Sequence, residues 1–134
     1  VGANSDVELK EKKDRVDDAI HATKAAIKEG IVPGGGVALL NAANSIKSKS
    51  DGNSIFIEAI KSPYKTILEN AGLEYVPQKG KGKGINVVTG ETVDMIKEGI
   101  IDPLLVTKSA LKNAVSVAST ILSTDCVISN MREE

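Results

Sequence analysis

The sequence predicts a mostly α-helical protein, and three observations lead to that class. Apolar residues recur at helical spacing in four long stretches, residues 6–29, 37–47, 54–71 and 102–122. Aromatic residues make up only 2% of the 134 residues, so the core must be built from Ile, Val, Leu and Ala, which suits close helix–helix packing. Strand-like composition is confined to two short segments, 85–93 and 124–129.

Composition and charge exclude several classes of function. Seventeen basic and eighteen acidic residues give a formal net charge of -1, which argues against a dedicated nucleic-acid surface. Cys126 is the single cysteine, so no disulfide forms within the chain and a reducing compartment is expected. No stretch approaches the ~20 apolar residues of a membrane span, so we expect no membrane partner.

The first predicted helix runs from Asp6 to about Glu29. Ser5 is suited to cap its start, and Gly30 to end it in the left-handed conformation that side chains resist. The apolar stripe of this helix consists of Val16, Ala19, Ile20, Thr23 and Ile27. Asp14 and Asp18 lie one turn apart on the opposite face. Acids on an exposed helix are usually a solvated face, and the spacing alone favours that interpretation over a metal site or a water-polarising role.

Three consecutive glycines, Gly34 to Gly36, precede a second helix that runs from Val37 to about Lys47 and is apolar enough to be buried. Glycine loses the most backbone entropy on folding, so something should require bare backbone here. Either the helix N-terminus brings its N–H groups to a nucleotide, or the glycines form a hinge and a tight helix entry. Without the downstream Lys-Ser/Thr of a P-loop, the glycines alone favour the hinge.

The middle of the chain predicts one helical region and one hairpin. Residues 48–53 are typical of an exposed connection, and residues 54–71 of two short helices or one kinked helix, because Pro63 lies inside the run. The alternating lysines and glycines of 79–84 predict a solvated loop, with phosphate contact as the less favoured alternative. Residues 85–93 predict a β-hairpin whose turn uses the positive φ of Gly90, followed by one helical turn over 94–98.

Asp102-Pro103 is the clearest helix start in the chain, with aspartate as N-cap and proline at the first helical position. This helix is predicted to reach about Leu122. Its expected buried stripe consists of Val106, Ala110, Ala114, Val117 and Ile121. Residues 124–129 predict a terminal strand that must find an edge to pair with.

Taken one at a time, the polar residues give only weak indications of metal binding or nucleotide binding. His21 is the single histidine and no metal-spaced cluster surrounds it, so no metal site is expected. The carboxylate of Asp102 can accept hydrogen bonds from ribose hydroxyls, as acids do in dinucleotide sites. The amide of Asn86 is able to pair with the edge of an adenine.

Taken together, two ordered motifs resemble the group I chaperonins, the ATP-driven folding machines of the GroEL type. The first motif is VDDAIHATKAA (16–26) followed by EGIVPGGGVAL (29–39), and the second is GIIDP (99–103) followed by VTKSAL (106–111). The resemblance covers essentially the whole chain and implies the last part of a longer subunit. Residues 1–29 then form the return limb of the intermediate domain, 30–33 a hinge, and 34–134 the C-terminal half of the equatorial ATP-binding domain, a helical bundle with a small hairpin and a terminal strand.

The resemblance also implies roles for single residues. Asp18 is similar to the family aspartate that swings over bound ATP and helps to orient the attacking water. The residues similar to those that contact the nucleotide are Gly35 at its backbone, Asn86 and Val87 beside the adenine, and Ile100 and Asp102 at base and ribose. The chain departs from the family pattern at Val87, which replaces a smaller residue, at Ile85, where relatives often carry an aromatic, and at Pro33, where many have alanine.

The implied cofactor is ATP or ADP, with Mg and K ions whose ligands lie outside this chain. The family's phosphate-binding Gly-Asp-Gly-Thr-Thr loop, its magnesium aspartate, its second hydrolytic acid and its apical domain have no equivalent here. The implied partners are unfolded clients, a co-chaperonin and further subunits in a homo-oligomeric double ring, in bacterial cytoplasm or an organelle matrix. The parent is then an ATPase, whereas this chain alone is expected to be inactive. The alternative is a non-enzymatic helical scaffold in which the glycines are only a hinge.

Overall fold

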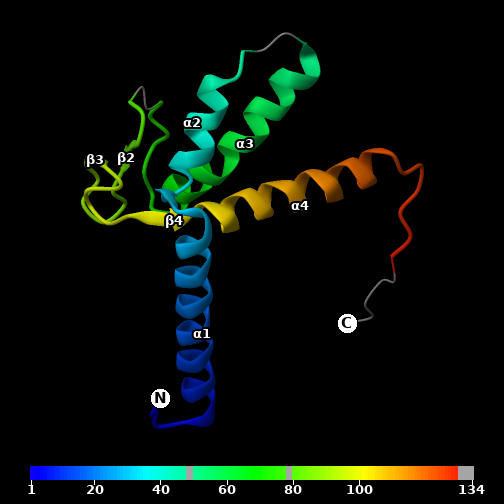
Figure 1. Ribbon diagram of the computed structural model, residues 1–134. Coiled ribbons are helices and arrows are strands. Elements are labelled where there is room, and N and C mark those ends of the chain that lie inside the picture. Colours follow the sequence, from blue (N-terminus) through cyan, green and yellow to red (C-terminus); the bar gives the residue numbers. More distant parts are fainter. Residues whose placement is uncertain (48–49, 78–79, 130–134) are drawn as a thin grey trace.

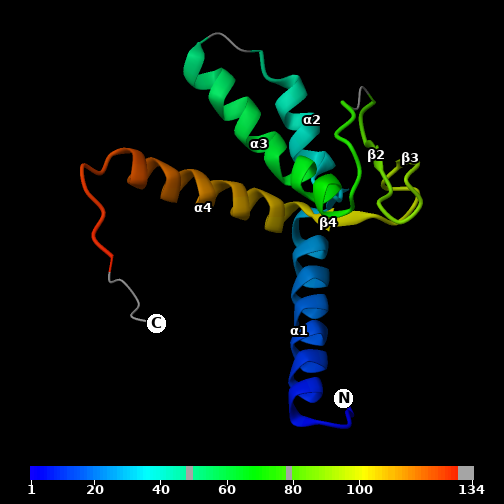
Figure 2. The same ribbon diagram turned by 180° about the vertical axis from the view of Figure 1, so that it is seen from behind.

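The structure is a computed structural model that describes residues 1–47, 50–77 and 80–129. It is mostly helical, as predicted, with two small two-stranded sheets in the described part. The elements in chain order are α1 (Asp6–Glu29), β1 (Ile31–Pro33), α2 (Val37–Ser45), α3 (Asp51–Asn70), β2 (Lys83–Ile85), β3 (Thr92–Asp94), β4 (Ile101–Pro103) and α4 (Leu104–Leu122). Figure 1 shows α1 and α4 leaving one junction in different directions, with α2 and α3 paired beside it, and Figure 2 shows the same arrangement from behind.

The junction is the antiparallel pair of β1 and β4, two strands that the sequence does not predict. Val32 lies opposite Asp102, and the pair is flanked by two further backbone bonds. The N–H of Leu104 donates to the carbonyl of Gly30 at 3.1 Å, and the N–H of Gly34 donates to that of Ile100 at 2.9 Å. Two segments far apart in sequence therefore meet where α1 ends and α4 begins.

The core lies between α2, α3 and the β2–β3 hairpin. Its buried cluster consists of Val37, Leu40, Tyr64, Leu68, Ile85 and Met95. The prediction of α2 is confirmed, and one face of it is buried through Val37, Leu40 and Ala43.

The prediction of α1 is confirmed at both ends. The side chain of Ser5 accepts a hydrogen bond from the N–H of Glu8, as an N-cap does. Gly30 has the expected positive φ of 86°, but its ψ of -170° is extended rather than left-handed helical, because the chain passes straight into β1. The apolar stripe is largely exposed, with Ile27 82% accessible. The carboxylate of Glu29 pairs with the ammonium of Lys108 on α4 at 2.5 Å.

One continuous helix, α3, begins earlier than the sequence predicts. Ser50 caps it by accepting from the N–H of Asn53, so residues 51–53 are helical and not part of a connection; residues 48–49 lie outside the described part. Pro63 lies within the helix, which agrees with the single-helix alternative. Gly72, with φ 71°, closes the segment.

The hairpin is confirmed, but its arms are shifted toward the lysine–glycine run. β2 comprises Lys83 to Ile85, so the prediction that this run forms no packed strand is wrong there; Lys79 lies outside the described residues. Gly84 is buried, and a Cβ on it would lie 2.5 Å from Cγ2 of Val37. Only glycine lets β2 approach α2 so closely. Gly90 supplies the positive φ of the turn, 73°. Residues 95–99 form a turn where one helical turn over 94–98 is predicted, and Asp94 belongs to β3.

Three predictions for the C-terminal part are wrong. Asp102 lies in β4 rather than at the N-cap, Pro103 occupies the cap position without a side-chain hydrogen bond, and α4 begins at Leu104. No residue of α4 is buried, because the helix contacts the rest of the described chain mainly near its start. The described residues 124–129 form no strand. In the described ranges, no helix has both the length and the apolar character to cross a membrane.

The close packing at Gly84 yields the first prediction. Gly84→Ala should lower the free energy of unfolding by about 1–3 kcal/mol, because the added methyl overpacks the contact with Val37 and Met95. Gly52→Ala is the matched control: nothing lies within 4 Å of its Cβ position and it is helical, so it should raise stability by about 0.4–1 kcal/mol. Urea unfolding of both variants measures the difference. Equal stability of Gly84→Ala and the wild type would contradict the packing described here.

Candidate functional site

The β1–β4 junction brings three of the six predicted site residues together. Gly35 lies in the turn between β1 and α2, and its neighbour Gly34 is hydrogen-bonded to the carbonyl of Ile100. Two residues further along, Asp102 pairs with Val32. The glycine turn and the half-buried carboxylate therefore lie on adjacent segments of backbone.

Each glycine of this turn, Gly34 to Gly36, is required for its own reason. A Cβ on Gly34 would lie 3.1 Å from the carbonyl of Ile100, and one on Gly36 would lie 2.8 Å from the backbone nitrogen of Tyr64. Gly35 and Gly36 both have positive φ, 62° and 77°. The packing of the turn alone thus explains the three glycines as a tight helix entry.

The same turn also offers hydrogen-bond donors. Within the described residues, the N–H groups of Gly35 and Gly36 have no acceptor, and they lie at the N-terminus of α2. Successive free N–H groups at a helix N-terminus carry positive partial charge and favour an anionic or electron-rich partner. The turn is therefore closely packed and still has two N–H groups that can donate hydrogen bonds to a ligand.

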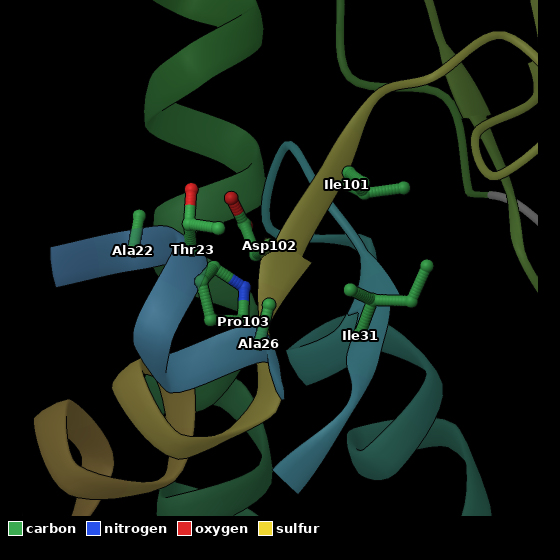
Figure 3. Close-up of a pocket in the computed structure, with 7 residues that line it drawn as sticks. All are labelled: Ala22, Thr23, Ala26, Ile31, Ile101, Asp102 and Pro103. Atoms are coloured by element: carbon green, nitrogen blue, oxygen red, sulfur yellow. The ribbon is translucent and has the colours of Figure 1, made fainter. Parts of the chain in front are cut away.

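Asp102 is the ionisable group of the junction. Its carboxylate has no hydrogen-bond or ion-pair partner in the part of the chain that the structure describes, and burial raises the pKa of this carboxyl above its ordinary value. Asp102 lines a pocket of about 180 Å³ between α1, β1 and β4. Figure 3 shows its carboxylate on the same side as the hydroxyl of Thr23. That hydroxyl donates to the carbonyl of Ala19 at 2.7 Å. Asp102 is thus partly desolvated without a compensating donor.

A second hollow, of about 370 Å³, shares Asp102 and Pro103 with the first and is also lined by Gly36. Its walls are mostly apolar and come from α2, α3 and α4, with Leu39, Ile67 and Val106 among them. Small-molecule sites combine such apolar walls with a few polar groups. Sequence reasoning missed Ile67 and Val106 as site residues, because their only signal was membership of an apolar helical stripe.

Asn86 and Val87 lie in the turn between β2 and β3 and line neither hollow. The side-chain oxygen of Asn86 accepts from the N–H of Val88 at 3.0 Å, which fixes the amide and leaves its NH₂ group to donate elsewhere. Val87 is 42% exposed. The structure does not bring this pair into contact with Asp102.

Asp18 also lies apart from the junction. It is exposed on α1, and at ~1.5 Å per residue it lies about 18 Å before Gly30 along the helix axis. The water-orienting role that the resemblance implies for Asp18 is therefore not assembled in this arrangement. Among the described residues, no group of three or more His, Cys, Asp or Glu side chains could hold a metal ion.

The fold and the junction define a mostly helical chain whose glycine turn and lone carboxylate flank an apolar hollow. A sequence profile described as the TCP-1/cpn60 chaperonin family matches residues 1–132, and this chain belongs to that family. The fold is similar to a crystal structure of a group III chaperonin in the open state, with a TM-score of 0.78 and 31% identity over 96% of this chain. The match covers 30% of that protein, so the chain spans under a third of this relative's length.

Asp102 yields the second prediction. Because burial raises its folded-state pKa above the unfolded value, the folded state binds more protons between the two pKa values, and stability falls as pH rises through the folded pKa. Asp102→Asn removes this penalty. The variant should gain stability relative to the wild type on going from about pH 3 to about pH 7, measured by urea unfolding at both values. A relative loss at neutral pH would instead mean that the ionised carboxylate has a stabilising partner.

Proposed function

We propose that this chain is the C-terminal region of a group I chaperonin subunit and supplies the adenine and ribose side of an ATP site. The subunit couples ATP hydrolysis to the folding of client proteins. Family membership supports the general assignment, and the two sequence motifs favour group I. The observation that carries the proposal is the junction, where the free N–H groups of Gly35 and Gly36 and the unpaired carboxylate of Asp102 lie on adjacent segments.

Each group at the junction has a role that its chemistry supports. The carboxylate of Asp102 accepts from the ribose hydroxyls and so regains the hydrogen bonds that burial removes. The backbone of Gly35 contacts the nucleotide through its N–H group, which has no acceptor among the described residues. Ile100 is held beside this turn, because its carbonyl accepts the hydrogen bond from the N–H of Gly34. Ile67 and Val106 provide apolar walls for a planar base.

Asn86 and Val87 complete the adenine side. Because the amide oxygen of Asn86 is held by the N–H of Val88, its NH₂ group is the one that faces a ligand. An NH₂ group donates to a ring nitrogen of a purine, since such a nitrogen is an acceptor. Val87 is exposed beside it and is able to cover one face of the base.

Residues 30–33 serve as a hinge. They connect residues 1–29, the return limb of the intermediate domain, to residues 34–134, the C-terminal half of the equatorial domain. The backbone of Gly30, with φ 86° and ψ -170°, lies in a region that essentially only glycine adopts. Rotation there carries Asp18 toward the nucleotide, where its carboxylate orients the attacking water. The exposed apolar faces of α1 and α4 then pack against the remainder of the subunit.

Bound ATP supplies the phosphoanhydride bond whose hydrolysis drives the folding cycle. By the resemblance to the family, the ligands of the Mg and K ions lie outside this chain. The proposed partners are unfolded clients, a co-chaperonin and further subunits in a double ring, in bacterial cytoplasm or an organelle matrix. A helical scaffold whose glycines serve only as a hinge is the competing function, favoured by the packing that already explains the glycine turn.

The third prediction concerns Asp18. In the full-length subunit, Asp18→Ala should lower the rate of ATP hydrolysis by about 10²-fold or more, because a positioned proton acceptor is lost, while the affinity for ATP stays nearly unchanged. Asp14→Ala, one helical turn away and also exposed, is the matched control and should leave both quantities near wild type. Steady-state hydrolysis and equilibrium ATP binding separate the two effects. A large loss of affinity in Asp18→Ala would show that its role is misassigned.

The fourth prediction separates the nucleotide site from a scaffold. Adding ATP to the full-length subunit should slow hydrogen exchange at the amides of Gly35 and Gly36, because they acquire acceptors on binding. A pure scaffold predicts no change at these amides.

The isolated 134-residue chain should show no hydrolysis above background. Turnover that survives purification and is abolished by Asp18→Ala would contradict this.

A further inference from the structure

Met95 lies beneath the glycine turn and belongs to none of the roles assigned so far. It follows β3 directly, is 2% exposed, and is a member of the buried cluster with Val37 and Leu40. Sequence reasoning passed over it as one apolar residue in a short turn. Its backbone is hydrogen-bonded to Ile100, and its side chain packs against Gly35; both residues belong to the proposed site.

The backbone of Met95 holds two segments. Its N–H donates to the carbonyl of Gly82 at 3.0 Å, and its carbonyl accepts from the N–H of Ile100 at 2.8 Å. Ile100 in turn accepts from the N–H of Gly34 at 2.9 Å. A continuous hydrogen-bonded path therefore runs from the loop before β2, through Met95 and Ile100, to the glycine turn.

The side chain of Met95 fills the space between two glycines. Its terminal methyl carbon lies 3.0 Å from the position that a Cβ on Gly35 would occupy, and its sulfur lies 3.0 Å from that of Gly84. An unbranched, flexible thioether suits such a narrow gap. Because Gly35 has no side chain of its own to pack, the methyl of Met95 is what supports the turn from the core side.

We propose that Met95 is a positioning residue for the nucleotide site, which supports Gly35 through its methyl group and holds Ile100 through its carbonyl. The inference rests on the proposed function, since it assigns Met95 to the site formed by those two residues. Truncation leaves a void directly under a turn of three glycines, whose backbone has the most conformational freedom to collapse into it. The turn then loses its fixed position relative to Asp102.

The test compares three variants of the full-length subunit. Met95→Ala removes the support, Met95→Leu keeps its volume, and Leu68→Ala truncates another fully buried member of the same cluster that lines neither hollow. Two quantities are measured for each variant: the hydrogen exchange without nucleotide of the Gly34 amide, which donates to the carbonyl of Ile100, and the equilibrium affinity for ATP. Urea unfolding shows how much stability each truncation removes.

Met95→Ala should speed exchange at the Gly34 amide and weaken ATP binding by about tenfold, which corresponds to the loss of about one hydrogen bond between the displaced turn and the nucleotide. Leu68→Ala should leave both quantities near wild type despite a comparable loss of stability, and Met95→Leu should restore most of the affinity. Similar effects of Met95→Ala and Leu68→Ala on both quantities, or unchanged affinity in Met95→Ala while the wild type binds ATP, would overturn the inference and leave the proposed function intact. A wild type that binds no ATP would overturn the proposed function, and the inference with it.

Discussion

The antiparallel pairing of β1 with β4 is the constraint on which the rest of the structure depends. It fixes Val32 opposite Asp102 and is extended at both ends by backbone bonds, from Leu104 to Gly30 and from Gly34 to Ile100. Because α1 leads into this pair and α4 follows it, the three residues of each strand set the directions of these two helices. The same pairing places the glycine turn beside the carboxylate.

Close backbone approach is the second feature that organises the molecule. Gly36 lies against the backbone of Tyr64, and Gly84 lies against Val37 and Met95, so α2 is enclosed on two sides at distances that exclude a Cβ. Such contacts leave little room for adjustment. Residues with special backbone conformations and a partly desolvated, unpaired carboxylate occur at the same junction, a combination that proteins retain mainly where function requires it.

The helices of this chain differ in how far their apolar faces are covered. α2 and α3 bury part of theirs against each other, whereas α1 exposes Val16, Ile20 and Ile27, and α4 buries none of its residues. Apolar exposure on this scale marks interaction surfaces. Under the proposed function, these two faces are covered within the subunit, and the hinge at Gly30 lets α1 change its position relative to the junction.

The sequence by itself determined what depends on local chemistry. Helical spacing and the Ser5 cap predicted α1, the glycine run predicted the entry of α2, and β-branched residues around Gly90 predicted the hairpin. The motifs of residues 16–39 and 99–111 were sufficient for the chaperonin family, which the profile match confirms.

Only the tertiary structure decided what depends on contacts between distant segments. A three-residue strand has too few residues for periodicity, so β1 and β4 exist because they pair with each other. Asp102, a good N-cap by local criteria, is drawn into β4 instead, and the burial that follows raises its pKa. Met95 gained its place beneath Gly35 in the same way, since no local pattern shows which backbone a buried side chain supports.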